Sequence, residues 1–531
     1  MQIFRFVVVF LCIFVASYTF AADSALDHMY IDAGGKISSI NVTGVKIKYY
    51  TFDEAYKETS DVKKLKRNFT ISVGNGVENE GIIKEILRKY SKARYLKHVH
   101  ALSVDIEENN LPAFIKNLMG RLNIKYIQKT PVKTINIDKI TFDKSITPSE
   151  APIYSPNDPL FNNQWYLYNK NNPNLDLGFL GYRKFIEGYN YTSPFGNNPP
   201  VVAVLDVGIY YDTEELRDRI YVNKGEIPNN NIDDDNNGYI DDYMGVDVGH
   251  LECTLSQCID DYKVHHGTMM ASIMGAKTDN NYYMSGILPD EVKILPISAS
   301  YDYTQVDRYN EGYNYILEMK DRGVNIIAVN VSAGGPYDVT EYNLLREFYN
   351  KDILVIAAVG NDNMNIDTNR GLGTSDGTRA YPAKYNLDNI IAVGAYDEKG
   401  NVAPFSNYGN TVDIYMPGVN IVDLNYPETP GYAAIGSGTS QAAAITSGLV
   451  GVAAYLYPEC SPIELRSLIL EKATEEVGSF SVTRRIGLFQ MPSRQTYKMR
   501  AAKISSVNGV GLVSDGQIQN YSCGGGYGIG R

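Results

Sequence analysis

The stretch VVAVLDVG (residues 201–208) is apolar almost without interruption until Asp206 ends the run. Such a run is typical of a parallel strand that is buried on both faces of a sheet. Later stretches repeat this character, and helical patterns such as YNEGYNYILEMKDRG lie between them; they are NIIAVNVSAGG (325–335), DILVIAAVGND (352–362) and NIIAVGA (389–395). The alternation predicts an α/β fold with a doubly wound, mainly parallel sheet.

Polar residues stand where these predicted strands end. Asp206, the segment 332–335 and Asn361 each follow an apolar run. In open α/β sheets, ligands and catalytic groups gather at the carboxyl ends of the strands. We therefore expect these residues to meet at one site.

Two predicted helices add the groups that a hydrolase needs. HGTMMASIMGA begins at His266, and an apolar helix without a charge before Glu459 follows Ser440. Asp206, His266 and Ser440 would supply an orienting acid, a base and a nucleophile at a helix N-terminus, whose backbone N–H groups favour negative charge. Asn361 would supply a side-chain donor to the oxyanion.

A second serine, Ser375, competes with Ser440 because both end a GTS tripeptide. GTSDG around Ser375 fits the G-x-S-x-G pattern of α/β-hydrolases, which requires serine, acid and histidine in that chain order. All six histidines precede residue 267, so this order is impossible. We expect Ser375 to be a loop residue.

Five motifs in one order carry a family resemblance. DVGIYYDTEEL, HGTMMAS, NVSAGG, AAVGN and GTSQAAA resemble the subtilisin-like serine proteases, or subtilases, over about Asn157 to Thr474. The resemblance implies that Asp206 orients the imidazole, His266 acts as general base and then general acid, Ser440 attacks, and Asn361 binds the oxyanion. A pseudoprotease that acts as a binding scaffold is the alternative, and the presence of all four groups disfavours it.

The resemblance also implies a substrate cleft. Protein substrates would bind as an extended added strand, which gains affinity from main-chain hydrogen bonds. The residues implied for the two walls are Ser332, Ala333 and Gly334 on one side and Ala358, Val359 and Gly360 on the other.

The acidic stretch IDDDNNGYIDD (232–242) has the alternate spacing of a calcium loop. Its candidate ligands are Asp233, Asp235, Asn237, Asp241 and Asp242. Met244 occupies the twelfth position, where an EF-hand has glutamate, so this is no EF-hand. A solvated acidic loop is the alternative, but the crowded carboxylates would repel one another without a cation. The resemblance implies a second calcium site with Asp158, Glu215, Asp279 and Asn281 as ligands.

The N-terminus, MQIFRFVVVFLCIFVASYTFAAD, combines an early arginine with a short apolar run and small residues at Thr19 and Ala21. This pattern predicts a signal peptide over residues 1–21 and secretion. A membrane anchor is the alternative, but no stop-transfer pattern follows. No other segment approaches the roughly 18 apolar residues that spanning requires, so we expect no integral membrane segment.

Secretion makes disulfides the expected state of the cysteines. After removal of Cys12, four remain, and three pairings are possible. The close spacing in CTLSQC favours Cys253 with Cys258, which leaves Cys460 with Cys523. Sequons stand at Asn41, Asn68, Asn190 and Asn520, whereas the sequon at Asn330 falls in an inner strand and should carry no glycan.

Charge is distributed unevenly along the chain. Residues 23–150 hold 21 Lys and Arg against 16 Asp and Glu, a net of +5, whereas residues 151–531 hold 27 against 45, a net of −18. The opposite signs favour attraction between two parts, although chance and solvated faces would give similar counts. The acidic main body argues against nucleic acid as a partner.

The basic part predicts a small α+β unit. Strand patterns occur in FTISVGNG, HVHALSVDI and IKYIQKT, and helical patterns in GIIKEILRKYSK and NLPAFIKNLMGRL. A Pro- and Ser-containing polar stretch that begins at VKTINID follows as a linker.

The resemblance implies a ferredoxin-like inhibitory propeptide over residues 22–143, a catalytic domain over 144–490 and a tail over 491–531. The catalytic domain would be inhibited by its own propeptide and act as a monomer. Self-cleavage would follow Asp138 or Asp143, which the sequence does not separate. The Asn- and Tyr-rich composition and the NDPLFNNQWYL segment resemble the apicomplexan branch, which works in secretory organelles during host-cell egress and invasion. A bacterial-type secreted subtilase is the alternative.

Overall fold

The computed structural model describes part of the chain. That part comprises residues 36–42, 45–51, 68–73, 80–90, 93–107, 110–118, 121–122, 124–131, 133, 155–171, 175–180, 183, 195–250, 265–300, 306–367, 380–424 and 433–471. The chain divides after Thr130 into a smaller and a larger compact unit. Each unit is described by itself.

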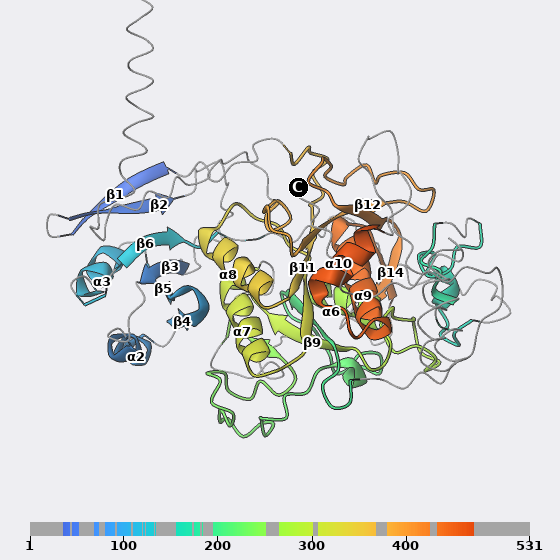
Figure 1. Ribbon diagram of the computed structural model, residues 1–531, viewed down its shortest axis with the longest axis horizontal. Helices are drawn as coiled ribbons and strands as arrows, with labels where there is room; N and C mark the ends of the chain where they lie inside the picture. The colour runs from blue at the N-terminus through green and yellow to red at the C-terminus, as the bar shows by residue number, and fades with distance from the viewer. Residues whose placement is uncertain are drawn as a thin grey trace, which may run out of the picture. The chain divides into compact units, whose positions relative to one another are not determined.

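The larger unit is built on a seven-stranded sheet with the order β13-β12-β11-β10-β7-β9-β8, in which every neighbouring pair is parallel (Figure 1). Its strands are β7 (Val201–Asp206), β8 (Val246–Asp247), β9 (Lys293–Ser298), β10 (Ile326–Val331), β11 (Leu354–Ala358), β12 (Ile390–Tyr396) and β13 (Ile414–Pro417). Strands β7, β10 and β11 are buried at every position, which explains why they read as continuous apolar runs.

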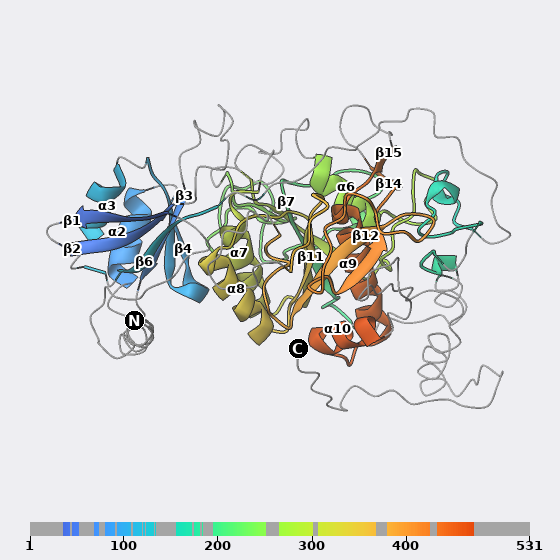
Figure 2. The same ribbon diagram turned by 90° about the horizontal axis from the view of Figure 1, so that it is seen from above.

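Helices cover both faces of this sheet. Helices α7 (Tyr309–Asp321) and α8 (Val339–Asn350) lie on one face, and α6 (His265–Gly275) and α9 (Thr439–Leu456) lie on the other (Figures 1 and 2). Helix α10 (Pro462–Glu471) packs on α9. The predicted doubly wound α/β fold is confirmed.

Short elements complete the larger unit. Strands β14 (Ile421–Leu424) and β15 (Ala433–Gly436) form an antiparallel pair, and β14 packs against α6. Single 3₁₀ turns span η6 (Phe161–Asn163) and η7 (Arg217–Arg219).

Helix α9 is buried along its whole length. Its many small residues allow neighbouring elements to approach closely: a Cβ atom on Gly451 would lie 2.2 Å from Leu288 Cδ2. A helix that is apolar on all sides belongs inside a core, and α9 contacts strands β10, β11, β12 and β13.

The smaller unit contains a six-stranded sheet with the order β1-β2-β6-β3-β5-β4. Its elements are β1 (Lys36–Val42), β2 (Val45–Thr51), β3 (Asn68–Val73), α2 (Glu80–Lys89), β4 (Arg94–Leu96), η4 (Lys97–Val99), β5 (Ala101–Asp105), α3 (Leu111–Leu118) and β6 (Ile124–Lys129). From β3 to β6 the chain runs βαββαβ with the strand order β6-β3-β5-β4, which is ferredoxin-like. Phe69, Ile71, Ile83, Phe114 and Ile127 are among its buried core residues.

Sequence reasoning placed β3, α2, β5, α3 and β6 but missed three strands. Strands β1 and β2 form an antiparallel hairpin in which Val42 pairs with Val45. The Thr-Gly pair between two β-rich runs was the available signal. Strand β4 has only three residues, too few to show an alternating pattern.

Asn68 corrects one expectation about glycans. Its side-chain amide donates to Ser103 Oγ at 2.9 Å and to Asp105 Oδ1 at 3.0 Å, and the residue is buried in the sheet. A glycan would replace one of the two hydrogens on this nitrogen and break at least one of these bonds in a buried position, so Asn68 is poorly suited to carry one in the folded unit. Asn330 is fully buried, as expected for an inner strand.

Several predictions fall outside the described residues: the signal peptide, Cys253, Cys258, Cys523, Ser375, Asn190, Asn520, the linker bonds after Asp138 and Asp143, and the tail. Within the described part, no helix is long and apolar enough to cross a bilayer.

Candidate active site

Strand register gathers the candidate catalytic residues at one edge of the large sheet. Leu205 of β7 pairs with Val331 of β10, and Val331 pairs with Ala357 of β11. Because the strands are parallel, Asp206, Ser332 and Ala358, which each come one position later, lie at the same carboxyl edge. Asn361 follows three residues after β11.

Asp206 and His266 form a buried pair at this edge. His266 Nδ1 lies 3.0 Å from Asp206 Oδ1 and 2.9 Å from Oδ2. Asp206 Oδ1 also accepts from the backbone N–H of Val207 at 2.8 Å, which fixes the carboxylate. A proton on Nδ1 that faces this carboxylate leaves Nε2 as the acceptor. Nε2 is buried and has no hydrogen-bond partner among the described residues.

Ser440 is the second residue of α9, and its helix packs against α6, which carries His266. The Ser440 hydroxyl donates to the carbonyl of Ser332 at 3.1 Å, and the Ser332 hydroxyl donates to the carbonyl of Ser440 at 3.2 Å. The structure thus holds the Ser440 hydroxyl on Ser332 instead of on Nε2 of His266. Catalytic hydrogen bonds in free enzymes are often misaligned and tighten when substrate binds.

Asn361 is fixed beside the N-terminus of α9. Its Oδ1 accepts from the backbone N–H of Thr439 at 2.9 Å and from the Thr439 hydroxyl at 2.8 Å. With the oxygen held there, the amide nitrogen is turned toward Gly438, where a Cβ atom would lie 3.3 Å from it. The Asn361 N–H₂ group is therefore close to the residue that precedes α9.

The two candidate cleft walls follow β10 and β11. Ser332, Ala333 and Gly334 come directly after β10, and the next residue, Gly335, pairs antiparallel with Tyr381. On the other side, Gly360 takes a φ of 100° and donates its N–H to the Thr439 hydroxyl at 3.2 Å. A Cβ atom there would lie 2.5 Å from Asn407 Nδ2, so this wall depends on glycine.

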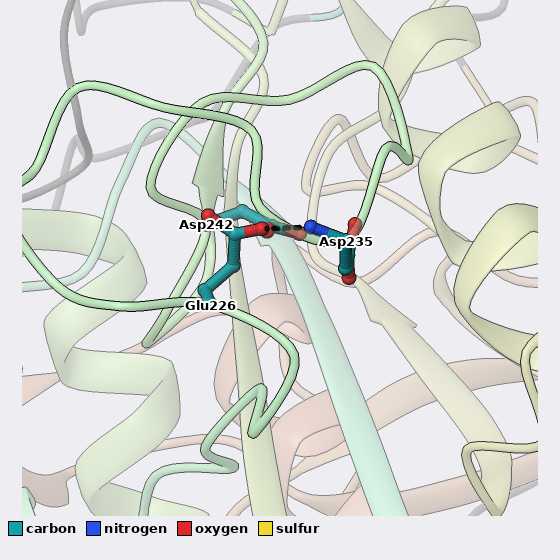
Figure 3. A group of neighbouring side chains, drawn as sticks. All are labelled: Glu226, Asp235 and Asp242. Carbon is teal, nitrogen blue, oxygen red and sulfur yellow. Dashed lines mark hydrogen bonds between the residues drawn. The ribbon is translucent and has the colours of Figure 1, made fainter.

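Three carboxylates converge in the acidic loop region. One oxygen each of Glu226, Asp235 and Asp242 lies within 4.8 Å of the other two (Figure 3). Glu226 Oε1 accepts from the backbone N–H of Asp235 at 3.0 Å. Sequence reasoning included Asp235 and Asp242 but missed Glu226, because it lies nine residues before Asp235 and outside the alternating pattern.

The other predicted ligands of this loop have different partners. Asp233 accepts from the backbone N–H groups of Asn237 and Gly238, and Asp241 accepts from those of Asn230 and Asn231. The Asn237 oxygen accepts from the backbone of Tyr239. These side chains therefore hold the loop backbone in turns around the three-carboxylate cluster.

The cluster suits a hard cation. Glu226 Oε2 is buried without a hydrogen-bond partner among the described residues. Burial raises the pKa of Glu226 and that of Asp242, since removal from water disfavours their charged forms. The Arg322 guanidinium lies 3.6 Å from Asp235 and offsets part of the charge. Calcium prefers carboxylate oxygens and would neutralise the rest.

The second predicted metal set gathers around the segment 279–285. Asp158 accepts from the backbone N–H groups of Asp279 and Asn280 and from the Ser285 hydroxyl. Glu215 accepts from Met284 N and from the Asn280 amide, and burial raises its pKa to about 7.

Two residues of this set have other contacts. Asp279 pairs with Arg183 at 2.8 Å, and Asn281 uses its backbone N–H on Asn157. Among the described residues, only the Glu226 cluster has three convergent carboxylates. The second calcium site stays a prediction.

Comparison with known proteins decides the family. The model of the subtilase family matches residues 197–488, more than half of the chain. The chain belongs to the subtilase family. This subtilase is a serine endopeptidase of the subtilisin-like class.

Curated relatives of this subtilase include bacterial proteases. It is 27% identical over 420 residues to a thermophilic serine proteinase of Bacillus sp. (strain AK1), which covers 78% of this chain and 86% of the relative. It is 31% identical over 220 residues to subtilisin DY of Bacillus licheniformis, with 40% of this chain and 72% of the relative covered.

A solved structure shares the fold at lower identity. The epidermin leader peptide processing serine protease of Staphylococcus aureus matches with a TM-score of 0.52 and 16% identity, over 80% of this chain and 97% of that one. These likenesses agree with the parallel sheet and its covering helices.

Cys460 lies after α9 and is disulfide-bonded. Its partner is outside the described residues, so the pairing with Cys523 stays a prediction.

Proposed function

We propose that this subtilase is a secreted, calcium-dependent endopeptidase that is made as an autoinhibited zymogen and cleaves proteins through an acyl-enzyme. The observation that carries the proposal is the buried Asp206–His266 pair at the carboxyl edge of the sheet, beside the helix that bears Ser440. A binding scaffold would not need an imidazole held in this tautomer.

In the proposed reaction, His266 Nε2 takes the proton of the Ser440 hydroxyl as Ser440 Oγ attacks the substrate carbonyl. The new oxyanion accepts hydrogen bonds from the Asn361 amide and from backbone N–H at the start of α9. His266 then gives its proton to the leaving amine, and the peptide bond breaks. A water repeats the sequence on the acyl-enzyme and restores Ser440. Asp206 orients the imidazole throughout.

The substrate would lie as an extended strand between the segments 332–334 and 358–360. The segment 332–334 directly follows β10, which supports main-chain pairing with an added strand there. Small side chains at both walls leave room for the substrate backbone.

Calcium would bind to Glu226, Asp235 and Asp242, while Asp233, Asn237 and Asp241 hold the loop around it. The second predicted set would use Asp158, Glu215, Asp279 and Asn281. Bound calcium would neutralise carboxylates and so stabilise the folded loop.

Residues 22–143 would form the inhibitory propeptide, released by self-cleavage after Asp138 or Asp143. The opposite net charges of the two parts would assist its binding, and inhibition would then weaken as salt rises. The resemblance to the apicomplexan branch favours a secretory organelle and a role in egress or invasion. Location of the tagged protein in a secretory granule would support this, and free export would support the bacterial-type alternative.

The test compares full-length chains that carry Ser440→Ala or Ser375→Ala with the parent. Parent and Ser375→Ala should lose an N-terminal piece of roughly 14 kDa, a size taken from its length, whereas Ser440→Ala should not. Ser375 is the matched control because it ends the other GTS tripeptide. Equal processing in all three chains would indicate an outside protease and favour the scaffold alternative.

A further inference from the structure

A lysine is buried in the larger unit with an acidic partner. Lys133 is 1% exposed, and its ammonium lies 2.8 Å from Glu341 Oε1, which is fully buried on α8. The ammonium also donates to the backbone carbonyl of Tyr381 at 3.0 Å and lies 4.6 Å from the ring centre of Tyr309. A carboxylate, a carbonyl and an aromatic face thus surround one positive charge.

We call Glu341 and the polar residues grouped around it and the Lys133 ammonium the lysine pocket. Its residues are Tyr309, Tyr313, Asp338, Glu341, Tyr381 and Tyr385. Tyr313 donates its hydroxyl to Glu341 Oε1 at 3.1 Å. The Tyr385 hydroxyl lies 2.9 Å from Glu341 Oε2 and also 2.9 Å from the backbone carbonyl of Asp338, which competes for its one hydrogen. Burial raises the pKa of both tyrosines well above 10.0, so both remain donors at neutral pH. Two hydroxyls and one ammonium together surround the Glu341 carboxylate.

Asp338 fixes the wall of the lysine pocket. It caps α8 by accepting from the backbone N–H groups of Thr340 and Glu341. Its other oxygen accepts from the Tyr309 hydroxyl at 2.6 Å and from Asn310 at 3.0 Å. The ring of Tyr309 is therefore held in the place where the ammonium meets its face.

The backbone of Lys133 is bound as an added strand would be. Lys133 N donates to Val306 O at 3.0 Å, and Val306 N donates to Lys133 O at 3.2 Å, which makes an antiparallel bridge. Extended peptides bind proteins through such main-chain pairs, with side chains entering pockets. Lys133 combines both features, a paired backbone and a buried side chain.

The lysine pocket adjoins the candidate cleft. The Tyr381 carbonyl that accepts from Lys133 also accepts from Gly335 N at 3.0 Å. Gly335 directly follows the cleft-wall segment 332–334. A peptide along that wall therefore passes close to the lysine pocket.

The sequence places Lys133 before the expected cleavage point. It stands five residues before Asp138 and ten before Asp143. Self-cleavage at either bond would put Lys133 on the released fragment. The lysine pocket would then lose its occupant, and Glu341 would be left without a cation.

We propose that the lysine pocket selects protein substrates with a lysine N-terminal to the cleaved bond, and that Lys133 is its occupant in the unprocessed chain. This rests on the proposed endopeptidase function. An uncharged side chain in the pocket would leave Glu341 buried without its charge partner, which disfavours such substrates. Lysine fits better than arginine because the Glu341 carboxylate, the Tyr381 carbonyl and the Tyr309 ring meet at one compact ammonium. The second carboxylate of the pocket, Asp338, already accepts four hydrogen bonds and is not available to a planar guanidinium.

The first arm of the test measures cleavage by self-processed enzyme. The substrate is the peptide of residues 129–145, compared with the same peptide carrying norleucine or arginine in place of Lys133. We expect kcat/KM to fall about 100-fold with norleucine, on the order expected when a buried charge loses its partner. In the Glu341→Gln enzyme, the kcat/KM values for the lysine and norleucine peptides should lie within about threefold of each other. This variant should cleave the norleucine peptide no worse than the parent does.

Glu347→Gln, on the same helix but partly exposed, is the matched control and should keep the parental ratio. Equal losses on both peptides in Glu341→Gln would show that Glu341 serves only the structure, and would overturn the proposal. So would a parental enzyme that cleaves the lysine and norleucine peptides equally.

The second arm measures binding and does not require catalysis. The full-length chain with Lys133→Met and Ser440→Ala should bind the labelled lysine peptide at least about tenfold more tightly than the norleucine peptide, by fluorescence anisotropy. Adding Glu341→Gln should abolish the difference. If the second arm shows selective binding but the first arm shows no cleavage, the endopeptidase function is refuted and the selectivity of the lysine pocket stands. If the first arm shows cleavage but the second arm shows unselective binding, only the selectivity of the lysine pocket is refuted.

Discussion

Replacing Lys133 by methionine should destabilise the larger unit by an amount that grows with pH. Methionine keeps most of the buried stem but removes the charge that faces Glu341. Burial raises the pKa of Glu341 above its ordinary value of 4.5, and the Lys133 ammonium opposes that shift. Without the ammonium, Glu341 can avoid a buried bare charge by taking up a proton.

Protonation of Glu341 sets an upper limit on the loss. Keeping Glu341 protonated in the folded variant lowers the free energy of unfolding by about 1.36 kcal/mol for each pH unit above 4.5. The largest loss of unfolding free energy is therefore about 3.4 kcal/mol at pH 7, about 2 kcal/mol at pH 6 and near zero at pH 4.5. The sign follows from linkage: the folded variant holds a proton that the unfolded chain releases, so its stability falls as pH rises from 4.5 to the raised pKa.

Urea unfolding at pH 5, 6 and 7 in the Ser440→Ala background measures this loss without self-cleavage. The single tryptophan of the chain, Trp165, lies in the larger unit and donates its ring N–H to Val419 O, so its fluorescence reports that unit. Lys351→Met is the control, because its partner Asp321 is on the surface; it should cost under about 1 kcal/mol at every pH. A Lys133→Met loss that is equal at pH 5 and pH 7 would refute the buried-charge reasoning.

Three further predictions test other parts of the molecule. Asp206→Asn should lower kcat on the order of 10⁴-fold, the size seen in related triads, without a change in urea midpoint; a loss below tenfold would contradict the assigned role. Glu226→Gln should lower the increase in melting temperature that calcium produces, while the melting temperature in EDTA stays the same or rises. An unchanged increase would show that calcium does not bind to this cluster. Burial raises the pKa of Asp423 to about 8, so the contribution of Asp423 to the stability of the folded state falls as pH rises above 3.8. Calorimetry should therefore show that Asp423→Asn raises the free energy of unfolding more at pH 7 than at pH 5.

The sequence predicted the larger unit well because its strands are buried on both faces. In β7 and β10 every residue is inside, so apolar runs marked the strands, and the polar residue after each run marked the edge. Asp206, Ser332 and Asn361 could be placed without coordinates for this reason. The strand order, with β7 between β10 and β9, needed the structure.

Contacts between distant residues were beyond the sequence. Glu226 joins Asp235 and Asp242 through the folding of one loop, and no spacing rule connects it to them. Lys133 and Glu341 are 208 positions apart, and a lone lysine in a polar linker reads as solvated. Burial of that lysine depends on tyrosines from two different segments, α7 and residues 381–385.

Catalysis and substrate selection share one architectural origin in this fold. In a parallel sheet, the helix that follows each strand begins at the carboxyl edge, and its N-terminal end favours negative charge. Tyr309 begins α7 after β9, and Glu341 is in the first turn of α8 after β10. The lysine pocket is thus formed at the same edge as Asp206 and Asn361. The N-terminal end of α8 favours negative charge at Glu341, and the Lys133 ammonium opposes the effect of burial on its pKa, so this edge is suited to bind an ammonium near the candidate cleft.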